Sequence, residues 1–175
     1  MQLLEYFMWK DQSCGLTNHL ATIGALLLLL IQPIATIIGA YFFGSLVIDS
    51  KKLLPIIWIY GIIIGIFAII GINYGMKHSL CSLPNGKHLD WNILELFGGK
   101  TGIYVFSILY YAMFLLLLLS RPWYLGFIIA IMLFGTLAFS VFFIKNPSWK
   151  SIWCWTVNFI PIVYIIISYF ILKKS

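Results

Sequence analysis

Long stretches without a charged residue dominate the chain, and their lengths predict its architecture. Four of them contain no Asp, Glu, Lys or Arg over 20 to 24 residues: 53–76, 101–120, 122–144 and 151–172. About 20 apolar residues in a helix span the hydrocarbon core of a bilayer. Because backbone groups in lipid must be hydrogen-bonded within their own segment, each stretch is expected to form a transmembrane helix.

These helices are expected near 54–74, 101–120, 122–143 and 152–172. Only the Arg121-Pro122 junction separates the second from the third, so these two should form an antiparallel hairpin. Pro122 suits the first turn of a helix, where its missing N–H group leaves no hydrogen bond unmade.

One further uncharged stretch, residues 12–48, has a length that fits neither one span nor two. The 33 residues from Leu16 to Ile48 would make a single helix of roughly 50 Å. Gln32-Pro33 either kinks one tilted helix or opens a turn between two short spans near 17–31 and 34–48. We favour the two short spans, which give six transmembrane helices, over the single kinked helix, which gives five.

The first nine residues resemble the last turns of an apolar helix that ends at an interfacial Trp9. A polar turn through Gly15 follows them. The segment has neither a basic start nor a small-residue cleavage site, so it does not fit a signal peptide. It is expected either to lie at the membrane interface or to end an upstream helix, which would raise the count from six to seven.

The long connection between the expected spans is the loop 75–100. Within it, Pro84-Asn85-Gly86 is a turn signal. Asn92 followed by Glu95 resembles a capping box, and the apolar residues beside them predict a short amphipathic helix on the membrane surface. Long ordered loops are where function concentrates, so a site is expected here first.

Composition supports an all-α, polytopic transmembrane helix bundle that forms a single domain, residues 1–175, with five to six spans. The chain is 62% hydrophobic and 9% charged, whereas a soluble domain carries about 25% charged residues. Its net charge of +6 comes mainly from lysines between apolar stretches, where they would meet lipid headgroups. The expected partner is therefore the lipid bilayer and not nucleic acid.

Charge does not decide which way the bundle faces. Apart from Lys10, five Lys or Arg residues flank the spans on each side of the expected topology, so the positive-inside rule favours neither orientation. A cytoplasmic C-terminus is preferred because Lys51-Lys52 and Lys173-Lys174 lie in short segments beside helix ends.

Small residues recur four positions apart, as in Gly61 and Gly65 and in Gly71 and Gly75. This spacing lets helix backbones approach closely. Gly61 and Gly65 are a candidate seam of a homo-oligomer, although packing within one chain is the favoured interpretation.

Two kinds of chemistry are conceivable near the long loop. His78, Cys81 and His88 carry imidazole and thiol groups of the type that bind zinc, but their spacing is not that of a known metal motif, so no metal or other cofactor is expected. Alternatively, Cys81 and Cys154 lie on the same side of the membrane and are a candidate disulfide pair if that side is oxidising. Cys14 reaches that side only if 16–48 forms one helix.

Six polar residues are expected at membrane depth: Glu5, Asn18, His19, Gln32, Asn73 and Asn158. Intramembrane ionisable groups are functional candidates by default. Here only Glu5 and His19 are ionisable, and both lie near predicted helix ends. The others form no row that would trace an ion path, so contacts between helices are the favoured role.

Several short motifs resemble multi-span membrane proteins of giant viruses and protists to which no activity is assigned. They comprise Gln2, Glu5 to Trp9, Asn18, Gln32-Pro33, Cys81 and His88-Leu89-x-Trp91. In that group the Glu-to-Trp motif closes a first membrane helix. The resemblance implies a polytopic membrane protein and nothing about a reaction.

Three functions are compatible with these patterns. The favoured one is a non-enzymatic membrane or envelope component that works through packing and partner contacts. A small oligomeric transporter or channel, with a path near Gln32, Asn73 and Asn158, is the second. A membrane-bound enzyme or metal protein that uses the loop 75–100 is the third.

Overall fold

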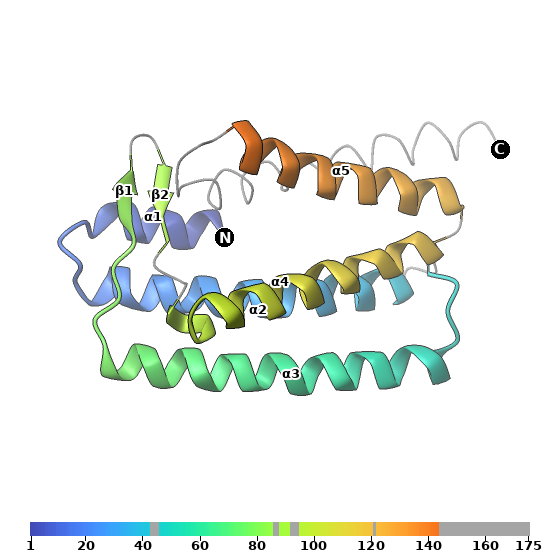
Figure 1. Ribbon diagram of the computed structural model, residues 1–175, viewed down its shortest axis with the longest axis horizontal. Coiled ribbons are helices and arrows are strands. Elements are labelled where there is room, and N and C mark those ends of the chain that lie inside the picture. Colours follow the sequence, from blue (N-terminus) through green and yellow to red (C-terminus); the bar gives the residue numbers. More distant parts are fainter. Residues whose placement is uncertain (43–45, 86–87, 92–94, 121, 144–175) are drawn as a thin grey trace.

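Long helices run side by side, and a short helix and a two-stranded hairpin lie at one end of them (Figure 1). This computed structural model describes residues 1–42, 46–85, 88–91, 95–120 and 122–143. The elements in chain order are α1 (Gln2–Lys10), α2 (Leu16–Phe42), α3 (Ser50–Lys77), β1 (Leu83–Asn85), β2 (His88–Asp90), the 3₁₀ turn η1 (Glu95–Phe97), α4 (Gly99–Leu115), the 3₁₀ turn η2 (Leu116–Leu119) and α5 (Trp123–Phe143).

Three of the described helices are long and apolar enough to cross a membrane. They are α2, α3 and the continuous segment Gly99–Leu119 formed by α4 and η2. Within α5 the described apolar stretch is shorter, Gly126–Thr136. The expected span 152–172 lies outside the described residues.

The stretch that begins at Leu16 forms one helix, so the two spans expected near 17–31 and 34–48 are wrong. Pro33 is buried inside α2, which continues to Phe42. A proline removes one backbone donor, and the polar groups beside it are bonded in other ways. The Thr36 hydroxyl donates to the Gln32 carbonyl at 2.9 Å, and the Tyr110 hydroxyl of α4 donates to Gln32 Oε1 at 3.0 Å.

Helix α2 forms the centre of the bundle, where Leu26, Leu30 and Ile37 are at most 1% exposed. Its contact with α3 depends on small residues. A Cβ atom at Gly71 would collide with the Leu26 side chain, and one at Gly75 would lie 2.8 Å from Ile23 Cδ1. By contrast, a Cβ atom at Gly61 or Gly65 would have no atom of the described residues within 4 Å. The close approach expected within one chain therefore occurs at Gly71 and Gly75 and not at the other pair.

The prediction of a short helix on the membrane surface after Asn92 is wrong for the described part of that segment. Residues Glu95–Phe97 form a single 3₁₀ turn that packs into the end of the bundle. Leu96 and Phe97 are at most 1% exposed, and the Phe97 ring stacks on Phe106 of α4 at 4.5 Å. Apolar side chains that the sequence pattern assigned to lipid thus fill space between helices.

A two-stranded antiparallel hairpin precedes this turn. β1 pairs with β2 in the register Leu83 to Asp90 and Asn85 to His88. The chain reverses where Pro84-Asn85-Gly86 predicted a turn. At the opposite end of the bundle, the connection after α2 meets the connection after α4, and the Val47 N–H donates to the Leu119 carbonyl at 2.9 Å.

Replacing Gly71 by leucine should destabilise the bundle, because the new side chain would displace Leu26 and press on the Leu96 carbonyl, 3.1 Å from the Cβ position. Overpacking of this kind costs about 1–3 kcal/mol. Gly61→Leu is the matched control, since its side chain would enter open space. Thermal unfolding in a mild detergent should show a lower Tm for the first variant only. Equal losses would contradict the close packing at Gly71.

Candidate functional site: the disulfide-bonded cap

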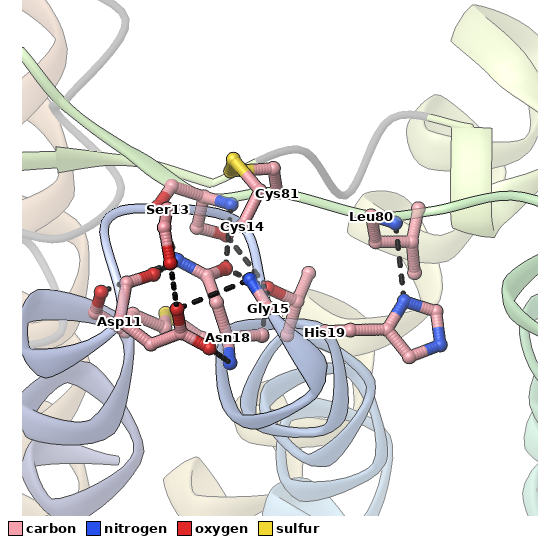
Figure 2. Close-up of a disulfide and its surroundings, with 11 residues drawn as sticks. Asp11, Ser13, Cys14, Gly15, Asn18, His19, Leu80 and Cys81 are labelled. Carbon is pink, nitrogen blue, oxygen red and sulfur yellow. Dashed lines mark hydrogen bonds between the residues drawn. A yellow bond between two sulfur atoms is a disulfide. The ribbon is translucent and has the colours of Figure 1, made fainter.

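Polar groups from distant parts of the chain meet where α2 begins and α3 ends. We call this assembly the cap and define it as residues 11–19 together with residues 78–82. Figure 2 shows the two segments crossing, with a disulfide on the outer side and hydrogen bonds beneath it.

The Asn18 side chain lies at the centre of the cap and is 0% exposed. Its Nδ2 group donates to the carbonyls of Met8 at 3.2 Å, Asp11 at 2.9 Å and Ser82 at 2.9 Å. Two hydrogens therefore serve three acceptors. Its Oδ1 atom accepts from the Ser82 N–H at 2.9 Å. One amide thus joins the end of α1, the polar turn and the segment after α3.

Thr22, one turn further along α2, extends this network. Its hydroxyl donates to the Asn18 carbonyl at 2.9 Å and lies 2.9 Å from the Ser82 hydroxyl. Both hydroxyl-bearing residues are 0% exposed. A buried polar group without a hydrogen-bond partner costs free energy. The hydrogen bonds to Ser82 therefore hold the segment around Ser82 in one position along α2.

Asp11 organises the start of α2. Its carboxylate accepts from the Asn18 N–H at 3.0 Å, the Ser13 hydroxyl at 2.9 Å and the Gly15 N–H at 3.1 Å. These donors, led by the Asn18 backbone, hold the pKa of Asp11 below its usual value of 3.8. A carboxylate at a helix N-terminus also interacts favourably with the helix dipole.

A disulfide joins Cys14 to Cys81, with their Cα atoms 5.1 Å apart across 67 residues of sequence. The candidate pairing of Cys81 with Cys154 is therefore wrong. Because 16–42 is one helix, its start lies on the same side as the end of α3, and this brings Cys14 to Cys81. Cys154 lies outside the described residues.

Beside the disulfide is an open cleft of about 370 Å³. Cys14, His19, Lys77 and His78 line it, together with Gly15, Leu16, Gly75, Met76 and Ser79. His19 Nδ1 accepts the Leu80 N–H at 3.1 Å, which leaves the proton of the neutral ring on Nε2. The His78 ring stacks on Tyr74 at 4.3 Å.

The metal site considered for His78, Cys81 and His88 loses one ligand, since a disulfide sulfur has no thiolate to offer. Within the described part of the chain no group of three His, Cys, Asp or Glu side chains is placed to hold a metal ion. The His88 side chain is outside the described atoms.

The polar residues expected at membrane depth do not converge. Glu5 is buried on α1, while His19 belongs to the cap. Gln32 bonds to Tyr110, and Asn73 is exposed on α3. From the helix rise, Gln32 lies about 24 Å and Asn73 about 6 Å from the cap end of the bundle. These two do not mark one path, and Asn158 lies outside the described residues.

Sequence reasoning singled out Asn18 as a polar residue at depth but missed its partners. Ser82 gave no signal of its own, because a serine in a loop is ordinarily exposed. The available clue was Asp11 ahead of an apolar helix, since an acidic residue at that place caps helices.

Comparison of the chain with known protein families, with curated proteins and with solved structures found no match. The interpretation of the cap therefore depends on its geometry alone.

Asn18→Ala should destabilise the protein by about 2–4 kcal/mol, because it leaves buried carbonyl and N–H groups without partners. Asn73→Ala removes the same amide from an exposed position and should change stability by less than about 0.5 kcal/mol. Thermal unfolding of both variants in detergent measures the difference. Similar Tm values for the two would show that the Asn18 hydrogen bonds do not stabilise the cap.

Acid should weaken the cap through Asp11. Its folded-state pKa lies below the unfolded value of 3.8, so its stabilising effect is present above that value and is lost as pH falls through the folded pKa. Asp11→Asn should therefore lower Tm at about pH 7, and this deficit should become smaller as the pH falls towards about 2. A Tm deficit of the same size at both pH values would contradict this linkage.

Proposed function

We propose that this chain is a multi-pass membrane protein that works as a non-enzymatic component of a membrane or envelope, through packing and contacts with partners. The outer face of α3 carries this proposal. Its large apolar side chains are each more than half exposed: Leu54, Trp58, Ile59, Ile62, Ile66 and Ile69.

Such a face is unfavourable in water, where burying one large apolar side chain is worth about 1.5–3 kcal/mol. Exposed apolar patches of this extent mark contact with a membrane or a protein. The length and apolar composition of α2, α3 and Gly99–Leu119 favour the membrane. With α5 and the uncharged stretch 151–172, the topology has five spans.

The non-enzymatic part of the proposal is supported by how the polar groups are used. Asn18 and Ser82 bond to each other inside the cap, Thr22 bonds to both from the next turn of α2, and Gln32 bonds to Tyr110 between helices. These contacts position helices and loops. The resemblance to multi-span membrane proteins of giant viruses and protists is in keeping with an envelope role.

The disulfide supports one of the two orientations that charge left open. Disulfides persist in oxidising compartments and are rare in the cytosol. The cap would therefore face the exterior or a lumen, and Lys51 and Lys52 at the other end would face the cytosol, as the positive-inside rule favours for short connections. The C-terminus would then be cytosolic.

A homo-oligomer that uses Gly61 and Gly65 stays a prediction. Within the described residues, no atom lies within 4 Å of a Cβ position at Gly61 or Gly65, which leaves room there for a second copy.

The topology is tested by Lys87→Thr, which completes a glycosylation sequon with Asn85 in the hairpin loop. In translation with microsomes, this variant should be glycosylated and should resist alkaline carbonate extraction. The same sequon appended after Ser175 should stay unmodified. The opposite pattern of glycosylation would overturn the orientation, and extraction by carbonate would overturn membrane insertion.

A further inference from the structure

The geometry points to a further activity for the cap: Cys14–Cys81 is an exchangeable disulfide that accepts a thiolate from a protein dithiol entering the cleft. The inference rests on the proposed function in one respect, because an oxidised bridge requires the cap to face an oxidising compartment. It goes beyond that function by giving the cap a chemical partner.

Cys14 and Cys81 are both partly exposed, and their place relative to the cleft distinguishes them. Cys14 lines the cleft of about 370 Å³, whereas Cys81 is not among its lining residues. Thiol–disulfide exchange needs the attacking thiolate to approach one sulfur along the S–S axis, and access selects which sulfur is attacked. An incoming thiolate would therefore meet Cys14 Sγ, and Cys81 would be the leaving group.

The walls of the cleft favour a thiolate. Lys77 is exposed in it, and His19 and His78 line it with imidazole groups. Nearby cationic and imidazole groups stabilise thiolates and so raise their concentration at the site. The nearest acid in the cap, Asp11, has its carboxylate bonded to Ser13, Gly15 and Asn18.

The hydrogen bonds beneath the bridge make exchange reversible. Asn18 and Thr22 hold Ser82 on α2, and His19 holds Leu80, on both sides of Cys81. Opening the disulfide leaves these bonds in place. The two thiols stay adjacent in the folded protein, so the bridge can form again without refolding.

The exchange balances as follows in atoms and electrons. A partner thiolate attacks Cys14 Sγ, an S–S bond forms to the partner, the Cys14–Cys81 bond breaks, and Cys81 leaves as a thiolate that takes a proton. The second thiol of the partner, as its thiolate, then attacks the mixed disulfide and releases Cys14. The partner dithiol is oxidised by two electrons and the cap disulfide is reduced; oxidised glutathione restores it by the reverse exchange.

The test uses the full chain in detergent with Cys154→Ser in every variant, so that the two bridge cysteines are the only ones present. The bridge of the folded protein should open with dithiothreitol and close again with oxidised glutathione, with an unchanged circular dichroism spectrum. Cys81→Ser, which leaves Cys14 free, should form a mixed disulfide with oxidised glutathione about tenfold or more faster than Cys14→Ser, which leaves Cys81 free.

Lys77→Gln should slow the reaction of the free Cys14 thiol with no change in Tm, which a purely structural lysine would not do. The inference would be overturned if the bridge opened only after denaturation, or if the two single-cysteine variants reacted at equal rates. The disulfide would then have a structural role only. Because these measurements are made in detergent, they are independent of membrane orientation. The glycosylation test can therefore contradict the proposed orientation while the exchange test supports the disulfide chemistry. Equally, the exchange test can fail while the proposed orientation holds.

Discussion

The buried amide of Asn18 is the interaction on which the described structure most depends. A side-chain amide with no access to water must find partners in the protein, since each buried polar group left unpaired costs about 1–3 kcal/mol. Its partners belong to three separate segments, at Met8, Asp11 and Ser82. Satisfying one side chain therefore brings together the end of α1, the start of α2 and the chain that follows α3.

The remaining features of the cap follow from this convergence. With Ser82 held on α2, Cys81 lies beside Cys14, and a disulfide closes over the hydrogen bonds. The disulfide and the hydrogen bonds hold together the same two segments, the start of α2 and the chain after α3. The disulfide can therefore open for exchange while the hydrogen bonds keep these segments in place. The cleft beside the disulfide is open and lined by both polar and apolar residues, whereas the bundle below it is apolar.

Apolar packing holds the bundle together, whereas hydrogen bonds hold the cap together. Along α3, Gly71 and Gly75 allow close approach to α2, and dispersion between packed apolar atoms supplies the attraction that the hydrophobic effect does not supply within lipid. In the cap, hydrogen bonds set the register. A membrane component built in this way has a uniform apolar body and one chemically distinctive end.

The sequence alone indicated a transmembrane helix bundle. Its few charged residues cannot cover a water-facing surface, and the stretches between them have the length that spans a bilayer. The helices expected near 54–74 and 101–120 overlap α3 (Ser50–Lys77) and α4 (Gly99–Leu115), but their ends differ by several residues. The sequence could not decide whether Pro33 ends a helix, since that depends on whether packing of α2 within the bundle offsets the backbone hydrogen bond that Pro33 cannot make. Nor could it pair the cysteines: only a single α2 brings Cys14 to Cys81. These outcomes depend on contacts between residues far apart in the chain, which only the tertiary structure decides.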